Sequence, residues 1–212
     1  ISTYVQLLIQ STPPEADSLG RLRAIQDQVA KVTAVVRAAL DSSRAPAIPR
    51  ERADLGLLVR RVCQMAGPML EDAGVQIEVM TPDQSVELVT DPVQFELALL
   101  NLVSNSIDAM ASGGKLSVRL EPVNDRLRLE IEDTGSGIPP ELLAHIFDPW
   151  VTTKPHGKGS GLGLSITRQV IASHGGTIRV DNRPGKGAMF TIDLPAAQGI
   201  HPDLAHAENS RR

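Results

Sequence analysis

The sequence contains one cysteine, Cys63, so no disulfide bond can form within the chain. This cysteine lies in a helical pattern of apolar residues, which favours a place in the core over a role as a nucleophile. A chain without disulfides fits a reducing compartment. We therefore expect a cytoplasmic location.

Long apolar runs and clustered positive charges are also missing. No apolar stretch approaches the roughly 18 residues that a membrane-spanning helix requires. The net charge is −4 at pH 7, and the lysines and arginines are dispersed along the chain. This distribution argues against nucleic acid or anionic lipid as the main partner, so a phosphorylated ligand would have to be bound by a few local groups.

The 212 residues, of which 42% are hydrophobic, suit one or two globular domains. Residues 1–45 are predicted to form a helical hairpin whose second helix has an apolar seam typical of helix bundles, made of Leu22, Ile25, Val29, Val32, Val36 and Ala39. An ordinary hairpin would explain this seam, and so would half of a dimeric four-helix bundle, which we favour. Residues 46–53 are predicted to be a linker and residues 196–212 a polar tail.

Residues 54–195 are expected to form a second domain of mixed helices and strands. Helices are predicted over 54–73, 91–110, 139–146 and 160–174, with aspartate caps on the first two. Strands of alternating apolar and polar residues are predicted over 75–80, 86–90, 115–120, 127–132, 177–180 and 189–194. Each strand has one apolar face. The pattern therefore predicts an α+β fold, a two-layer sandwich whose largely antiparallel sheet is covered by helices on one side.

A glycine-rich run over residues 148–166 leads into the helix predicted over 160–174 and includes its first residues. It combines lysines with alternating glycines: Lys154, Gly157, Lys158, Gly159, Gly161 and Gly163. Glycines let successive backbone N–H groups face one anion, and a helix start adds partial positive charge, so this run is typical of phosphate binding. It matches neither the P-loop nor the GxGxxG dinucleotide motif. A flexible loop would have a similar composition.

Two further groups of polar residues carry possible chemistry. Asn101, Asn105 and Asp108 form one stripe on the helix at 91–110, which is either a solvated face or a source of an amide-oxygen ligand for Mg²⁺. Asp133 follows a strand and precedes Gly135 and Gly137. These residues suit an ordinary turn. They also suit a site in which the carboxylate accepts a hydrogen bond from the exocyclic amine of adenine and glycines leave room for the base.

Four motifs resemble, in order, the N, G1, F and G2 boxes of sensor histidine kinases: N-L-V-S-N-S-I-D-A-M, D-T-G-S-G-I, I-F-D-P-W-V-T-T-K and G-K-G-S-G-L-G-L-S-I. The order and spacing match over residues 54–195. The resemblance implies the Bergerat ATP-binding fold shared with gyrase, heat-shock chaperone and mismatch-repair ATPases. The box wording is most similar to the nitrogen-regulation and dicarboxylate-sensor branch, and residues 1–45 resemble the dimerisation and phosphotransfer hairpin.

The resemblance also implies roles for single residues. Asn105 would hold Mg²⁺, Asp133 would bind the adenine amine, and Lys154 with Lys158 would offset triphosphate charge. Residues 148–160 would form a mobile lid. Many relatives have a lysine at the position of Asp108, so its absence leaves Lys154 as the principal cation. The residues expected to contact nucleotide are Asn101, Asn105, Asp108, Asp133, Gly135, Gly137, Ile138, Thr152, Thr153, Lys154, Lys158, Gly159, Ser160, Gly161, Leu162, Gly163 and Leu164.

The largest departure from the family lies at the front of the chain. The family's phosphoacceptor histidine belongs to an H-E-x-x-N-P-type box, and Ile1 resembles the residue that follows this box. We therefore expect the catalytic histidine upstream of Ile1. None of the histidines present lies in the hairpin, since they are His145, His156, His174, His201 and His206.

The function implied by the resemblance is that of the catalytic core of a two-component histidine kinase. Such a core binds MgATP and passes the γ-phosphoryl group to a histidine and then to an aspartate of a response regulator receiver domain. We expect ATP and ADP as ligands, Mg²⁺ as cofactor and a homodimer formed through the hairpin. Nucleic acid is not expected as a partner, and a membrane only through an upstream sensor region.

Two other functions would use the same fold: ATP hydrolysis and a non-catalytic scaffold. An ATP-hydrolysing machine of the gyrase type places a general-base glutamate four residues before the metal asparagine, where this chain has Asn101. That difference argues against rapid hydrolysis. A non-catalytic dimeric scaffold is disfavoured because all four nucleotide boxes are intact.

Overall fold

The computed structural model describes residues 50–154, 161–183 and 185–196. The predicted hairpin, the first part of the linker and the tail after Ala196 lie outside these residues. The chain divides into two compact units: Ile146–Ile166 belongs to one, and Ile48–His145 with Thr167–Arg212 makes up the other. Among the residues described, no helix is long and apolar enough to cross a bilayer.

Helices are interspersed with pairs of strands along the chain. In order they are β1 (Glu51–Asp54), α3 (Leu55–Met65), α4 (Gly67–Ala73), β2 (Val75–Met80), β3 (Glu87–Thr90), α5 (Pro92–Asp108), β4 (Gly114–Val123), β5 (Arg126–Asp133), the 3-10 turn η1 (Pro140–Leu142), α6 (Gly163–Ser173), β6 (Thr177–Arg183) and β7 (Gly187–Pro195).

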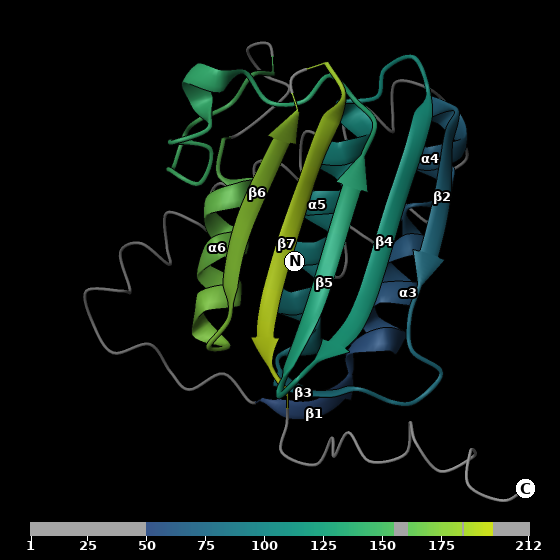
Figure 1. Cartoon of the computed structure of the whole chain (residues 1–212), viewed down its shortest axis with the longest axis vertical. Coiled ribbons are helices and arrows are strands. Elements are labelled where there is room, and N and C mark those ends of the chain that lie inside the picture. The colour runs from purple at the N-terminus through teal and green to yellow at the C-terminus, as the bar shows by residue number, and fades with distance from the viewer. Residues whose placement is uncertain (1–49, 155–160, 184, 197–212) are drawn as a thin grey trace, which may run out of the picture. The chain divides into compact units, whose positions relative to one another are not determined.

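Five strands form the main sheet in the order β2-β4-β5-β7-β6, with β2 and β4 parallel and the other pairs antiparallel (Figure 1). In the antiparallel pair β4–β5, Val118 lies opposite Ile131, and both side chains are buried. On the other face, Asp193 of β7 binds Arg128 of β5 and Arg179 of β6. The alternation in sequence therefore separates an apolar face from a charged face.

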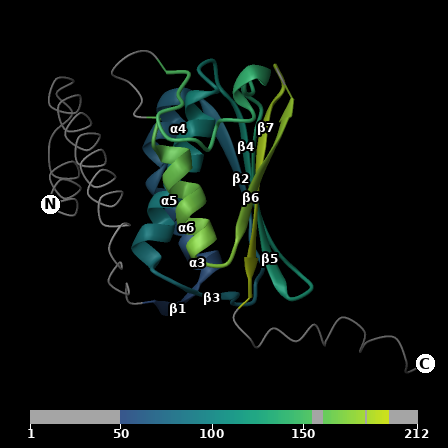
Figure 2. The ribbon, with the colours of Figure 1, turned by 90° about the vertical axis from the view of Figure 1, so that its left-hand side faces the viewer.

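The apolar face of the sheet is covered by α3, α4 and α5, which lie together on one side of it (Figure 2). Helix α6 is attached to α5 through Thr167, whose hydroxyl donates to the Ala98 carbonyl at 3.4 Å. The predicted two-layer α+β sandwich with a mixed sheet is confirmed. The physical reason is that each strand has only one face to bury.

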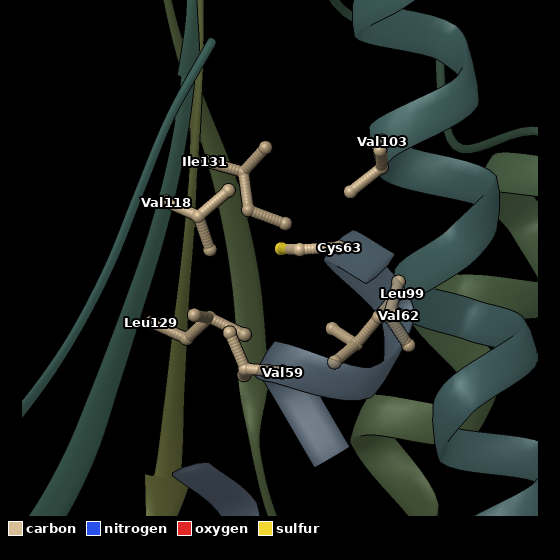
Figure 3. A pocket seen from close by; sticks show the side chains of 8 residues that line it. All are labelled: Val59, Val62, Cys63, Leu99, Val103, Val118, Leu129 and Ile131. Carbon is tan, nitrogen blue, oxygen red and sulfur yellow. The ribbon is translucent and has the colours of Figure 1, made fainter. Parts of the chain in front are cut away.

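Cys63 belongs to α3, and its side chain faces the sheet (Figure 3). There it lines an apolar cavity of about 10 Å³. Its thiol points toward Val118 and Ile131, and burial raises its pKa to about 11. The thiol therefore stays protonated at neutral pH, and the cavity has room for no more than about one water. The prediction of a core cysteine is confirmed.

The single helix predicted over 54–73 is wrong, because the structure has two helices there. Asp54 caps the first of them as expected, since its Oδ1 accepts from the Gly56 and Leu57 N–H groups at 2.8 and 3.3 Å. The helix then stops at Ala66, and α4 begins with Pro68 in its first turn. Proline lacks an N–H and restricts the preceding residue, so it favours a new helix start over continuation.

Two other predicted boundaries differ from the structure. Strand β1 lies largely within the stretch assigned to the linker and pairs antiparallel with β3. Its four residues show no alternation of burial, which is why their pattern did not indicate a strand. The helix predicted over 139–146 is reduced to the single 3-10 turn η1.

His174 joins the end of α6 to β3. Its Nδ1 lies 2.6 Å from the Val170 carbonyl, and its Nε2 lies 3.0 Å from the Thr90 hydroxyl. A carbonyl can only accept, so the proton is on Nδ1 and Nε2 accepts from the Thr90 hydroxyl, which shares its hydrogen with the Asp91 carbonyl 3.3 Å away. The ring also meets Phe95 edge to face, with centroids 5.8 Å apart. His174 is thus a buried residue that uses both ring nitrogens in hydrogen bonds.

Replacing Thr90 with valine should destabilise the domain by about 1–3 kcal/mol, because the buried Nε2 of His174 loses its donor. Denaturant unfolding measures the change. Val89→Thr is the matched control, since Val89 is 44% exposed and the reverse exchange there should change stability by no more than about 0.5 kcal/mol. Equal unfolding midpoints for Thr90→Val and the unmodified protein would contradict the assigned hydrogen bond.

Candidate functional site

The candidate site is built around Asp133, the last residue of β5, which is only 3% exposed. Its Oδ1 accepts hydrogen bonds from the Gly135 N–H at 2.9 Å and from the Ala188 N–H on β7 at 3.3 Å. These two bonds fix the carboxylate at the end of the sheet. Both end on Oδ1, so the carboxylate has a defined orientation.

Burial raises the pKa of Asp133, and the neighbouring charge of Glu132 raises it further. The Gly135 and Ala188 N–H groups and the Ser106 hydroxyl act in the opposite direction. An acid with a raised pKa in the folded state contributes stability below its unfolded pKa and loses it as pH rises through the folded pKa. The ionised carboxylate therefore destabilises the free protein at neutral pH, which favours a role in binding over one in folding.

Two glycines allow the backbone to approach this carboxylate closely. A Cβ on Gly187, where φ is +100°, would lie 1.8 Å from the Asp133 carbonyl oxygen, and one on Gly135 would lie 2.5 Å from the Ala109 carbonyl oxygen. The Ser136 N–H donates to the same Ala109 oxygen at 3.1 Å. The loop after β5 is thereby held against the end of α5.

The same loop is fixed from the other side by Asn182 of β6. The Ile138 N–H donates to Asn182 Oδ1 at 2.7 Å, and Asn182 Nδ2 donates to the Ile138 carbonyl at 2.8 Å. This residue was not predicted to belong to the site. None of the four motifs that carry the family resemblance contains it.

The polar stripe of α5 divides into two parts. Asn101 donates from Nδ2 to the Thr167 hydroxyl at 3.1 Å and so connects α5 to α6. Asn105 is half-buried and Asp108 is exposed. Both lie in the last turn of α5, beside the Ala109 carbonyl that anchors the Gly135 loop. The structure thus brings Asn105, Asp108 and Asp133 to one end of the domain, together with Gly135, Gly137 and Ile138.

The donor set at this end fits Mg²⁺ only as a partial site. Among the described residues there is no cluster of three or more His, Cys, Asp or Glu side chains that could hold a metal ion. The Asn105 amide and the Asp108 carboxylate supply hard oxygen donors in the last turn of α5. Mg²⁺ is commonly bound by one or two protein oxygens together with substrate phosphates and water, which is the arrangement that these residues fit.

The glycine-rich segment belongs to the other compact unit. The Lys154 N–H donates to the Thr152 hydroxyl at 3.1 Å, and Thr153 is exposed. The Trp150 N–H donates to the Gly161 carbonyl at 2.8 Å, and a Cβ on Gly161 would lie 2.5 Å from the Trp150 backbone. Lys158, Gly159 and Ser160 lie outside the described residues.

Helix α6 begins directly after these glycines, at Gly163. The preceding Leu162 is buried, and its carbonyl accepts from the Ser165 hydroxyl at 2.8 Å and from the Ile166 N–H at 3.0 Å. Leu164 is half-buried. The glycine run therefore ends in a helix start, whose N–H groups favour an anion.

Comparison with protein families identifies one domain. The family model described as histidine kinase-, DNA gyrase B-, and HSP90-like ATPase matches residues 90–198, more than half of the chain. The sensor histidine kinase ZraS of Escherichia coli (strain K12) is 30% identical over 181 residues, which cover 85% of this chain and 38% of ZraS. The two-component sensor PprA of Pseudomonas aeruginosa is 33% identical, covering 86% of this chain and 21% of PprA. The chain thus spans less than half of these relatives.

Solved structures show the same similarity. The catalytic domain of histidine kinase ThkA has a TM-score of 0.63 and 31% identity, over 70% of this chain and 96% of that domain. Full-length ShkA in complex with AMPPNP has a TM-score of 0.70 and 26% identity, over 92% of this chain and 42% of ShkA. ThkA in complex with the response regulator protein TrrA has a TM-score of 0.65 at 24% identity, over 92% of this chain and 57% of ThkA, which shows the fold alone.

Replacing Gly135 with alanine should lower nucleotide affinity at least tenfold and destabilise the domain, because the new Cβ meets the Ala109 carbonyl and displaces the loop that carries Asp133. Calorimetry and thermal unfolding measure the two effects. Gly67→Ala is the control, since a Cβ there meets nothing within 4 Å. Unchanged affinity in Gly135→Ala would show that the loop position does not matter for binding.

Proposed function

This chain belongs to the histidine kinase-, DNA gyrase B- and HSP90-like ATPases, and within them to the sensor histidine kinases, and we propose that it binds MgATP and transfers the γ-phosphoryl group to a histidine. The relatives are longer than this chain. The complete reaction is therefore proposed for the protein of which this catalytic domain is the ATP-binding part.

The observation that carries this proposal is the buried, oriented carboxylate of Asp133. A buried charge is unfavourable unless something in the bound state compensates it. An exocyclic amine donates to such a carboxylate, and adenine presents one at the edge of a flat base. A Cβ on Gly187 would lie 3.1 Å from Asp133 Oδ1, so a glycine at this position keeps the space beside the carboxylate open. Adenine is the base that this chemistry favours.

The remaining residues are assigned to the phosphates and the metal. Asn105 would hold Mg²⁺ with help from Asp108, and bound Mg²⁺ would neutralise charge on the phosphates. Lys154 and Lys158 would offset the rest of that charge. The glycines from Gly159 to Gly163 would present backbone N–H groups, with Thr152, Thr153, Ser160, Leu162 and Leu164 completing the segment. Binding of a nucleotide also fits the AMPPNP complex of ShkA.

In the reaction, the domain positions the γ-phosphoryl group and an acceptor histidine supplies the nucleophile. A ring nitrogen of that histidine attacks the γ-phosphorus, a P–N bond forms, and the P–O bond to ADP breaks. Asp133 would hold the base, and Asn105 of α5 would hold Mg²⁺, which would supply positive charge to the phosphates, so that the γ-phosphorus would be presented in a fixed direction. His174 is unsuited as the acceptor because both of its ring nitrogens are occupied.

The gyrase-like alternative is not favoured. Its general base would occupy the position of Asn101, whose amide cannot take a proton from water and is bonded to Thr167. This contact gives Asn101 a role in joining α5 to α6. A non-catalytic scaffold would not need a destabilising buried carboxylate, so this function is less favoured than that of a kinase.

We propose a response regulator as the partner that receives the phosphoryl group, because the related kinase ThkA has been solved with one. Homodimerisation through residues 1–45, a cytoplasmic location and membership of the nitrogen-regulation and dicarboxylate-sensor branch remain predictions from the sequence. The same is true of any membrane contact through an upstream region.

Two variants should separate the base from the metal. Asp133→Asn should weaken ATP binding about tenfold to a hundredfold with or without Mg²⁺, because it removes a charged acceptor for the amine. Asn105→Ala should weaken it chiefly when Mg²⁺ is present. Calorimetric titrations in Mg²⁺ and in chelator test this, with Ser104→Ala on the same helix as control. An equal loss for Asn105→Ala in both conditions would count against the metal assignment.

Phosphoryl transfer itself is tested with γ-labelled ATP. The protein extended upstream of Ile1 should become labelled on a histidine in the added segment, and the label should be acid-labile and base-stable, as expected for a phosphoramidate. The 212-residue chain should bind ATP and remain unlabelled. Label on His145 or His174, or rapid ATP hydrolysis without labelling of the extended protein, would favour the ATPase alternative.

A further inference from the structure

Asn182 of β6 holds one residue of the loop after β5 by both of its backbone groups. Its Oδ1 accepts from the Ile138 N–H at 2.7 Å, and its Nδ2 donates to the Ile138 carbonyl at 2.8 Å. Only one orientation of the amide satisfies both bonds, because the flipped amide would place donor against donor and acceptor against acceptor. Asn182 therefore fixes the position of Ile138 and the direction of its backbone groups.

Asn182 also lies in one row with Asp133 across three neighbouring strands, β5, β7 and β6 (Figure 1). Ala188 of β7 is opposite Asn182, and Met189 is opposite Glu132 of β5, so Ala188 is next to Asp133. The Ala188 N–H donates to the Asp133 carboxylate at 3.3 Å. Side chains opposite one another share a face of the sheet. A small residue, buried to all but 5%, thus separates two polar side chains at the end of the apolar face.

The loop after Asp133 is held at both of its ends. At its near end the Gly135 N–H donates to the Asp133 carboxylate at 2.9 Å, and at its far end lie the two bonds to Asn182. Between them the Gly185 N–H donates to the Ser136 carbonyl at 2.7 Å. Neighbouring strands lie about 4.8 Å apart, so this loop spans about 10 Å from β5 to β6. It forms a border of fixed width beside the carboxylate.

We propose that Asn182 is a positioning residue that makes the site select adenine over guanine. This inference rests on the adenine site proposed above and deepens it by naming what sets its specificity. Adenine has an exocyclic amine at the ring position where guanine has a carbonyl oxygen, which the Asp133 carboxylate repels. Guanine would bind this carboxylate through its N2 amine only after a shift in the plane of the base. By fixing the loop beside the carboxylate, Asn182 prevents that shift.

A purely structural role of Asn182 makes a different prediction about nucleotide binding. Loss of its two hydrogen bonds lowers stability in either case, so the melting temperature does not separate the two roles. A domain that is merely less stable binds every nucleotide less well by the same factor, because only the folded fraction changes. A released loop instead changes the ratio of ATP affinity to GTP affinity. This ratio therefore tests the proposal.

Calorimetry with Mg²⁺ measures the affinities of Asn182→Ala for ATP and GTP. We expect about three- to tenfold weaker ATP binding, the scale of one neutral hydrogen bond, with no loss of GTP affinity. Ile178→Val is the control, since Ile178 lies near the start of the same strand, opposite Ile192 of β7. Removing a methyl group there lowers stability through packing. It should leave the ratio of ATP to GTP affinity unchanged.

A second variant, Asn182→Asp, tests the same bonds with a side chain of equal size. Its carboxylate still accepts from the Ile138 N–H but places an oxygen against the Ile138 carbonyl. We expect the ratio of ATP to GTP affinity to fall at least as far as in Asn182→Ala. Gly185 still holds the loop in both variants, so both should fold, which thermal unfolding checks. If one of them fails to fold, the other carries the test.

Several outcomes would overturn the proposal. Unchanged ATP affinity, or an equal loss for ATP and GTP, would mark Asn182 as structural. The same change of ratio in Ile178→Val would show that the ratio follows stability. Equal affinity of the unmodified protein for ATP and GTP would overturn this inference and leave the proposed function in place. Failure of the unmodified protein to bind ATP would instead overturn the proposed function, and this inference with it.

Discussion

The fixed carboxylate of Asp133 connects segments that are distant in sequence. One of its oxygens accepts from the Gly135 N–H of its own loop and from the Ala188 N–H of β7. The loop is in turn bonded to the end of α5 through Ala109 and to β6 through Asn182. These contacts require backbone groups to approach within hydrogen-bond distance, which only glycine at 135 and 187 permits. The end of the sheet is therefore shaped by one buried acid.

This arrangement lowers the stability of the free protein at neutral pH. Burial raises the pKa of Asp133, so keeping it ionised is unfavourable until a ligand supplies a donor. Ser106 has a buried hydroxyl without a hydrogen-bond partner among the described residues. Elsewhere in these residues Thr191 is the only other buried side chain of this kind.

The C-terminal end of helix α6 is bonded to the segment that contains β1 and to strand β3. The helix begins at Gly163, directly after the glycine-rich run, and ends at Ser173. At that end the Ser173 carbonyl accepts from the Arg50 guanidinium at 2.7 Å, and His174 binds Thr90 of β3. Arg50 immediately precedes β1, which pairs with β3. Arg50 therefore contacts the last residue of α6, the helix that begins directly after the proposed phosphate-binding segment.

The sequence by itself determined the elements whose cause is local. Asp54 and Asp91 cap helices because their side chains reach N–H groups two and three residues ahead, and alternating strands follow from a sheet with one buried face. The four boxes in order indicated the family. The pairing of β1 with β3, the contact of Asn182 with Ile138 across 44 residues and that of His174 with Thr90 across 84 residues follow from the tertiary structure. Such contacts depend on which segments the sheet brings together, and no local pattern encodes that.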